Sequence, residues 1–398
     1  MLLGRNLSMN TDLKRKVLTT LAASGLCMAL AGCIPASLAD TTATGALFGA
    51  RPAAEPLSIN IFVASTRPGP RSNALGDGTA HFSLNMISVP PGHQAGQIEL
   101  PTFGKASPKN HFVVSYERGM GAEEFSSQIA SNLSGRVGAD RDILVFVHGF
   151  NTSLDEARLR LAQIVADGRF GGVPVLFTWA SSSHFLAYES DKQAATVARD
   201  ALGNLLRDLG QTSGIGRVHV LAHSMGGWLA METLRESAIG GNGNLNGRLG
   251  EVMLAAPDID LGVFRQQMAR LQGARVSVFA SAGDRALNLS SRLAGQRPRV
   301  GAIDASKSGD RAELQKLGVT IYDLSQFSAG LTGHAIYANA PAVIRTIGAE
   351  LTRTREGEGS GMSVIDAGVN RPAPVSSTPG VVETLPLPGS GGAGAVQP

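Results

Sequence analysis

Residues 218–227 read VHVLAHSMGG and run from an apolar, strand-like segment directly into a helical one. Ser224 stands at the junction, with Ala222 two positions before it and Gly226 two positions after it. Both flanking positions need small residues, because a serine on so sharp a turn brings its neighbours against adjacent backbone. The N–H of Met225 lies at the start of the new helix, where negative charge is favoured. The segment therefore predicts a nucleophilic serine raised above the edge of a sheet.

Strand-like and helical segments alternate on both sides of this turn. Residues 143–147 and 252–256 are continuous apolar runs, as expected for strands buried on both faces. Ser153 and Glu156 have the spacing of a capping box, which predicts a helix up to about residue 167. Further strands are expected at 59–63, 82–89, 111–116, 173–179, 217–222, 276–280 and 319–322, and further helices at 123–133, 192–209, 226–237, 262–271 and 340–352. This alternation predicts an α/β fold with a mostly parallel central sheet and helices on both faces.

A His-Gly turn follows the strand predicted at 143–147. In hydrolases with this topology, the turn offers one backbone N–H to an oxyanion, and the residue after the nucleophile offers another. The N–H groups of Phe150 and Met225 are the candidates for this pair. The alternative interpretation is a turn in which Gly149 permits the bend and His148 caps a backbone group.

A nucleophilic serine needs a base, and the order of residues in this topology is serine, acid, histidine. The chain has eight histidines, at positions 81, 93, 111, 148, 184, 219, 223 and 334. His334 is the one that follows Ser224, so it is predicted to be the base. We expect His219 and His223, which flank the turn, to be packed or structural.

Two aspartates are candidates for the acid that would hold the imidazole in its productive tautomer. Asp284 follows the strand predicted at 276–280, two strands after the nucleophile, which is the usual position of the acid. Asp258 follows the intervening strand, a position that some relatives use instead. An aspartate at the end of a strand is often only a helix N-cap, and this reading stays open for Asp258.

The N-terminal segment has the pattern of an export signal. The basic residues 14–16 precede an apolar run at 17–32 that is too short to span a bilayer, which needs about 20 residues. The junction Leu30-Ala31-Gly32-Cys33 resembles the lipobox of bacterial lipoproteins, which implies cleavage before Cys33 and acylation of that residue. The alternatives are an ordinary signal peptide or an uncleaved anchor.

Processing at this site would change the composition of the chain. The full sequence has 398 residues and a net charge of +3, but 31 basic and 31 acidic residues remain after position 32, so no basic surplus points to nucleic acid. Acyl chains on Cys33 would attach the protein to a membrane. The residue after Cys33 is Ile34 and not an aspartate. By analogy with the sorting of bacterial lipoproteins, this favours the periplasmic face of the outer membrane in a host that has two membranes.

The predicted organisation is a signal peptide at 1–32, a flexible tether at 33–57, a catalytic domain at 58–353 and a disordered tail rich in Gly, Pro and Ser at 354–398. Two cysteines exclude a disulfide framework and a four-cysteine zinc site. No Walker A, H-E-x-x-H or paired C-x-x-C motif occurs, so no cofactor and no metal are expected. The sequence does not indicate an oligomeric state.

Several motifs together resemble the bacterial α/β-hydrolases of unknown function called DUF900. They are VASTR at 63–67, VPPGH at 89–93, FVHGFNTS at 146–153, LFTW at 176–179, AHSMG at 222–226, AAPDID at 255–260 and DRAL at 284–287. The resemblance covers about residues 58–350. One departure is Ala180, where a proline is expected after Trp179, and this affects the rim of the site.

The resemblance implies an α/β-hydrolase fold and esterase-like chemistry without a defined substrate. Together with the candidate residues, it favours a membrane-anchored serine hydrolase of the carboxylesterase or lipase type, acting on a small-molecule or lipid ester through an acyl-enzyme. Residues 181–188 are candidates for part of a lid or acyl pocket, or for simple packing. Two alternatives remain open: a non-catalytic envelope lipoprotein that binds a partner, and an acyltransferase.

Overall fold

The apolar run at 143–147 forms β4 (Ile143–Val147), an inner strand of a sheet with ten strands in the described part of the chain. The structure is a computed structural model that describes residues 55–68, 76–182, 187–293, 295–327, 333–353 and 362–364. The strand order is β10-β9-β8-β7-β6-β4-β5-β1-β2-β3. The other strands are β1 (Leu57–Ser65), β2 (His81–Val89), β3 (Val113–Met120), β5 (Val173–Thr178), β6 (Val218–His223), β7 (Leu249–Ala255), β8 (Arg275–Ala280), β9 (Thr320–Asp323) and β10 (Met362–Val364).

Most of the sheet is parallel. β1 pairs in parallel with β5, and all pairs from β5 through β4 and β6 to β10 are parallel as well. β2 and β3 extend the sheet beyond β1 in antiparallel pairs. Parallel strands end at the same edge of a sheet, so the loops after β1, β4, β5, β6, β7, β8 and β9 all begin at one edge.

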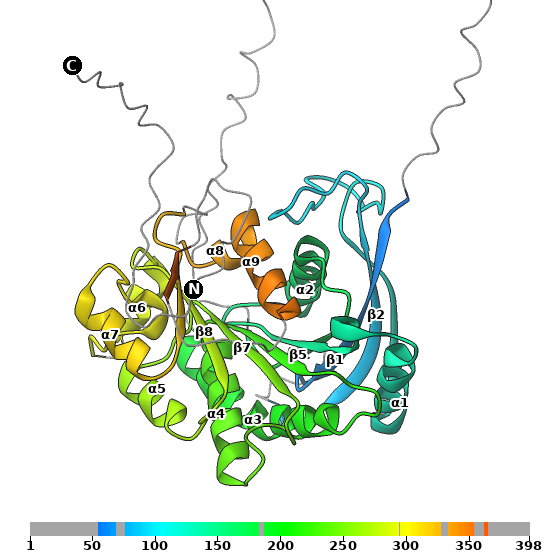
Figure 1. The fold of residues 1–398 in the computed structure, drawn as a ribbon. Coiled ribbons are helices and arrows are strands. Elements are labelled where there is room, and N and C mark those ends of the chain that lie inside the picture. Colours follow the sequence, from blue (N-terminus) through cyan, green and yellow to red (C-terminus); the bar gives the residue numbers. More distant parts are fainter. Residues whose placement is uncertain are drawn as a thin grey trace, which may run out of the picture. The chain divides into compact units, whose positions relative to one another are not determined.

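Helices cover both faces of the sheet (Figure 1). One face packs against α1 (Ala122–Leu133), α3 (Tyr188–Gly210), α4 (Met225–Ile239) and α5 (Leu261–Met268). The other face packs against α2 (Leu154–Gly168), α8 (Ile336–Asn339) and α9 (Pro341–Thr352). Two further helices, α6 (Arg285–Leu293) and α7 (Ser308–Lys316), lie between β8 and β9 in the sequence.

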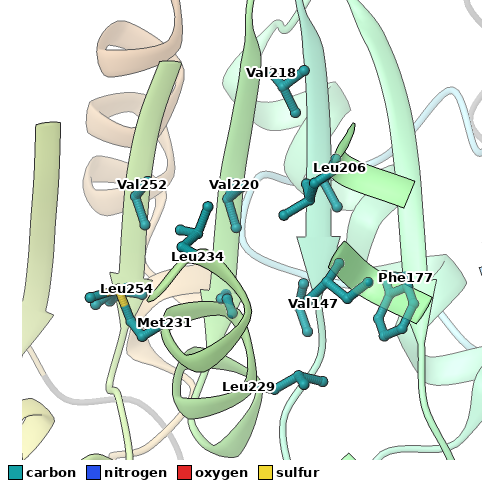
Figure 2. Packing of buried hydrophobic residues seen from close by; sticks show 14 of the residues in the cluster. Val147, Phe177, Leu206, Val218, Val220, Leu229, Met231, Leu234, Val252 and Leu254 are labelled. Atoms are coloured by element: carbon teal, nitrogen blue, oxygen red, sulfur yellow. The ribbon is translucent and has the colours of Figure 1, made fainter. Parts of the chain in front are cut away.

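The side chains of β4 alternate between two hydrophobic cores. Val145 and Val147 belong to the core beneath α3 and α4, whereas Leu144 and Phe146 belong to the core beneath α2 and α9. Figure 2 shows the first core, in which Leu229, Met231 and Leu234 of α4 pack against the inner strands. A strand buried on both faces has no polar face, which explains the unbroken apolar run.

The predicted mostly parallel α/β sheet with helices on both faces is confirmed. The capping box at Ser153 and Glu156 is present, with both reciprocal hydrogen bonds. The sequence did not indicate α6, α7 or α8. Among the described residues, no helix combines the length and the apolar character needed to cross a membrane.

Two predictions concern the ends of the chain. Disorder was predicted for residues 354–398, but β10 lies within this segment and pairs with β9. For these three residues the prediction is wrong, because β9 presents an open edge whose backbone groups are available for pairing. The signal peptide at 1–32, the tether up to residue 54 and Cys33 lie outside the described residues, as does the rest of the tail.

Candidate active site

Ser224 lies at the carboxyl end of β6, between the strand and α4. Its backbone has φ 53° and ψ −122°, a conformation that is unfavourable for a residue with a side chain. The turn is held by hydrogen bonds from the Ser224 N–H to the carbonyl oxygen of Ala255 at 3.0 Å and from the Gly227 N–H to the carbonyl oxygen of Ser224 at 2.9 Å. The expected strained strand–turn–helix is therefore present at this serine.

Glycines at two positions allow the chain to pass close to this turn. A Cβ atom on Gly226 would lie 2.2 Å from the carbonyl oxygen of His148 and 2.6 Å from that of Val147. A Cβ atom on Gly149 would lie 2.9 Å from the Cβ of Ser224. The turn after β4 thus passes directly against the serine, and only glycine fits at either position.

His148 is buried and fixes the peptide that carries the Phe150 N–H. Its Nδ1 lies 2.9 Å from the carbonyl oxygen of Gly149, which can only accept, so Nδ1 carries the proton and donates. Its Nε2 accepts from the backbone N–H of Trp179 at 3.2 Å. Burial lowers the pKa of His148 to about 3, so the ring is neutral. Since the C=O and N–H of a trans peptide point in opposite directions, this bond also orients the Phe150 N–H.

A partly buried arginine contacts His148 in turn. Arg67 follows β1, and its Nη2 lies 3.2 Å from His148 Nε2 and donates to the carbonyl oxygen of Thr152 at 2.6 Å. Its Nε donates to Thr178 Oγ1 at 2.7 Å and its Nη1 to the carbonyl oxygen of Ser181 at 3.0 Å. Burial lowers the pKa of Arg67 to about 10, which leaves it charged at neutral pH. The cation therefore joins the loops that follow β1, β4 and β5.

Sequence reasoning missed the role of Arg67, although the residue belongs to one of the motifs that carry the family resemblance. The one available signal was a charged residue two positions after a strand that ends at the same edge as Ser224. The two N–H groups assigned to the oxyanion, those of Phe150 and Met225, donate to no protein acceptor among the described residues. They remain available to a ligand.

His334 and Asp284 lie together at the same edge. His334 Nδ1 is 2.7 Å from Asp284 Oδ2. The Asp284 side chain is fully buried, and its Oδ1 accepts from the N–H of Leu287 at 3.0 Å, so the same carboxylate caps α6. The His334 side chain is 19% exposed. The structure thus gives the histidine selected by chain order a carboxylate that is held in place by a helix terminus.

Asp258 makes a different set of contacts. It accepts hydrogen bonds from the hydroxyl groups of Tyr188 at 2.8 Å and Ser290 at 2.7 Å, and it lies 3.2 Å from Nε of Arg299. Burial and the neighbouring Asp258 raise the pKa of Tyr188, so the phenol stays protonated and donates. The sequence left both aspartates as candidates for the acid. In the structure Asp284 contacts His334, whereas Asp258 pairs with Arg299.

His223 connects the base to the serine turn. Its ring lies 4.7 Å from that of His334 and stacks on Tyr337 at 4.6 Å. Burial and the neighbouring His334 lower its pKa well below the usual value, so His223 is neutral. Its Nε2 lies 3.3 Å from the carbonyl oxygen of His334. The residue directly before Ser224 therefore contacts the segment that carries the base.

Two other histidines in the described part contact carboxylates. His93 lies between Glu99 and Asp167, each at 2.9 Å, and His219 lies 3.2 Å from Asp142. Among the described residues, no group of three or more His, Cys, Asp or Glu side chains is arranged to hold a metal ion.

The model of one protein family, "Alpha/beta hydrolase of unknown function (DUF900)", matches residues 122–355. The chain belongs to this family. The α/β-hydrolase fold follows, and with it the general assignment as a hydrolase. No curated protein matches the chain significantly.

Solved esterases show a distant likeness to the DUF900 chain. An esterase from Pyrobaculum calidifontis is 15% identical, with a TM-score of 0.34, over 55% of this chain and 78% of the esterase. A fungal esterase from Rhizomucor miehei is 11% identical, with a TM-score of 0.36, over 75% of this chain and 83% of the other. A ferulic acid esterase from Streptomyces cinnamoneus is 13% identical, with a TM-score of 0.34, over 78% of this chain and 94% of the other. Similarities this low carry no argument about activity.

Proposed function

We propose that this DUF900 protein is a lipid-anchored serine hydrolase that cleaves carboxylic esters. Ser224 is the nucleophile, His334 the base and Asp284 the acid, while the N–H groups of Phe150 and Met225 bind the oxyanion. The observation that carries the proposal is the 2.7 Å contact between His334 Nδ1 and buried Asp284. It occurs beside a serine held in a strained backbone conformation, a combination typical of functional sites.

Asp284 accepts from Nδ1 of His334 and leaves Nε2 to act as the base. Nε2 takes the proton of the Ser224 hydroxyl as Oγ attacks the ester carbonyl carbon. The tetrahedral oxyanion accepts from the two backbone N–H groups, and removing one such donor typically lowers the rate by about 10²–10³. Collapse expels the alcohol, which takes the proton from His334. Water then repeats the sequence on the acyl-enzyme and releases the acid.

The arrangement around His148 supports the oxyanion assignment. Its Nδ1–H is bonded to the Gly149 carbonyl oxygen, so the peptide dipole that would meet the oxyanion is fixed before substrate arrives. Arg67 adds a positive charge that contacts the same imidazole ring. A donor that does not reorganise during the reaction stabilises developing charge more effectively than mobile water.

The test of the catalytic assignment is labelling by a fluorophosphonate probe, with wild type beside Ser224→Ala. Labelling of wild type and none of Ser224→Ala is expected. Folded wild type without labelling would favour the non-catalytic binding protein, and labelling that survives Ser224→Ala would place the nucleophile elsewhere. Product analysis with an added alcohol then separates hydrolysis from acyl transfer.

The lipid anchor on Cys33 is proposed from the lipobox alone. Wild type is expected to stay in the membrane fraction after washing with high salt and carbonate, because acyl chains hold it by buried hydrocarbon rather than by charge. Cys33→Ala is expected to be released. A wild-type protein that washes off would contradict the anchor and leave the catalytic assignment untouched.

A further inference from the structure

A cavity of about 330 Å³ lies next to the turn that carries Ser224. Met225, the residue after the serine, forms part of its wall, and so does Tyr188 of α3. The Tyr188 ring also contacts that of Phe150, with 5.6 Å between centroids. Of the two residues assigned to the oxyanion, Met225 lines the cavity and Phe150 contacts its wall through Tyr188. Its volume is at the small end of ligand pockets, which suits a short substituent better than a long hydrocarbon chain.

Cationic side chains line this cavity. Arg299 is only 9% exposed and is held by Asp258, 3.2 Å from its Nε, and by the carbonyl oxygen of Ser290, 3.4 Å from its Nη2. Its buried Nε has this ion-pair contact but no hydrogen-bond partner among the described residues. Lys192 and Arg297 also line the cavity and are exposed, and their charged groups have no polar partner in the described part of the chain.

The acidic side chains in the wall are already occupied. Asp258 accepts from the hydroxyl groups of Tyr188 and Ser290 and faces Arg299. Asp260 caps α5 by accepting from the N–H groups of Gly262 and Val263 at 2.9 Å and 3.1 Å. The three cations and two anions of the wall give a net charge of +1. Arg299 and Asp258 form an ion pair, so this surplus comes from Lys192 and Arg297 against the single charge of Asp260.

We propose that this cavity binds one carboxylate group of the substrate, so that the preferred ester carries a carboxylate on its acyl or its alcohol portion. The inference rests on the proposed function. A guanidinium matches a carboxylate in geometry and makes strong charge-assisted hydrogen bonds with it. A single net charge suits a monoanion better than a doubly charged phosphate monoester.

Two pairs of matched esters test the inference on the full-length protein. For the acyl side, 4-nitrophenyl hydrogen adipate is compared with 4-nitrophenyl hexanoate, and for the alcohol side, 4-acetoxybenzoate is compared with its methyl ester. In whichever pair carries the carboxylate on the correct side of the ester, kcat/KM for the carboxylate member is expected to exceed that for the neutral member by about tenfold or more. The ratio is the readout, because a folding defect lowers both rates together.

Variants then locate the preference. Lys192→Gln and Arg297→Gln are each expected to lower the ratio, and the double variant is expected to bring it close to one. Lys316→Gln is the matched control, because it removes one exposed cation at the end of α7 and is expected to leave the ratio as in wild type.

The outcomes separate this inference from the proposed function. A wild type that reacts with the fluorophosphonate probe but shows no preference in either pair would overturn the carboxylate site and leave the hydrolase standing. A preference that persists in the double variant would also overturn the site. A folded wild type that neither reacts with the probe nor hydrolyses any of the four esters would refute both.

Discussion

Replacing Asp284 by Asn removes a buried charge and keeps the shape of the side chain. Oδ1 of Asp284 accepts from Leu287 and Oδ2 faces His334 Nδ1. Since asparagine also caps helices well, the amide oxygen is expected to stay on Leu287 and the NH₂ group to face the imidazole. An NH₂ group only donates, so Nδ1 must accept and Nε2 must carry the proton. In that tautomer His334 cannot take a proton from Ser224.

The expected loss in kcat is about 10⁴-fold, the size reported for the same change in a serine protease triad. At 1.36 kcal/mol for each tenfold change, this corresponds to about 5 kcal/mol of transition-state stabilisation. The melting temperature is expected to change by only a few degrees, because the helix cap remains. Release of 4-nitrophenol from a short-chain ester measures kcat, and calorimetry measures the melting temperature.

The matched control is Asp258→Asn at the other candidate acid. This change breaks the buried pair with Arg299, which typically costs about 3–5 kcal/mol of stability, so its main effect is expected on the melting temperature. The reasoning would be refuted if Asp284→Asn kept more than a tenth of the wild-type kcat. It would equally be refuted if the kcat of folded Asp258→Asn fell by about 10⁴-fold.

Three further changes probe the support of the site. Gly226→Ala places a Cβ 2.2 Å from the His148 carbonyl oxygen. We therefore expect the free energy of unfolding in urea to fall by about 2 kcal/mol or more, and the fluorophosphonate probe to label the protein more weakly. An unchanged free energy of unfolding would contradict the close approach. Arg67→Met removes three hydrogen bonds to the end of β5 and the segments that follow β4 and β5, so kcat is expected to fall about tenfold or more with little change in KM. An unaltered kcat would show that the arginine is only structural. His148 has a folded-state pKa of about 3 against 6.5 for the unfolded chain, so its stabilising contribution is complete above about pH 6.5 and declines as the pH falls toward 3. Urea unfolding at pH 7, 5.5 and 4.5 should show this decline in wild type and a smaller one in His148→Gln, and equal slopes would argue against it.

Local patterns were sufficient to predict the inner sheet and the elements that carry the serine. β4 is buried on both faces, so its apolar run is unbroken. The spacing of small residues around Ser224 is a local sequence pattern, although the backbone that Gly226 must accommodate comes from Val147 and His148. The pairing of His334 with an aspartate followed from chain order alone. Chain order could not decide between Asp284 and Asp258, because both residues follow parallel strands at the same edge of the sheet.

Long-range contacts account for what the sequence did not reveal. Arg67 meets Thr178 across 111 positions of the chain, and nothing near Arg67 in the sequence indicates that partner. α7 has the sequence SGDRAELQK and buries only Leu314 among its residues, so it shows no apolar period. The cavity beside Met225 combines side chains from α3, α4 and the segments around α5 and α6, which become neighbours only in the folded sheet.

The double contact of Asp284 bears on how relatives of this protein are compared. The carboxylate at that position has two independent roles, since it starts α6 as well as facing His334. A homologue that has lost activity would still gain stability from an aspartate there, so its presence is a poor marker of a working enzyme. The histidine at position 334 has no comparable folding duty toward α6, and a substitution there is the more informative sign that a relative has become a pseudoenzyme.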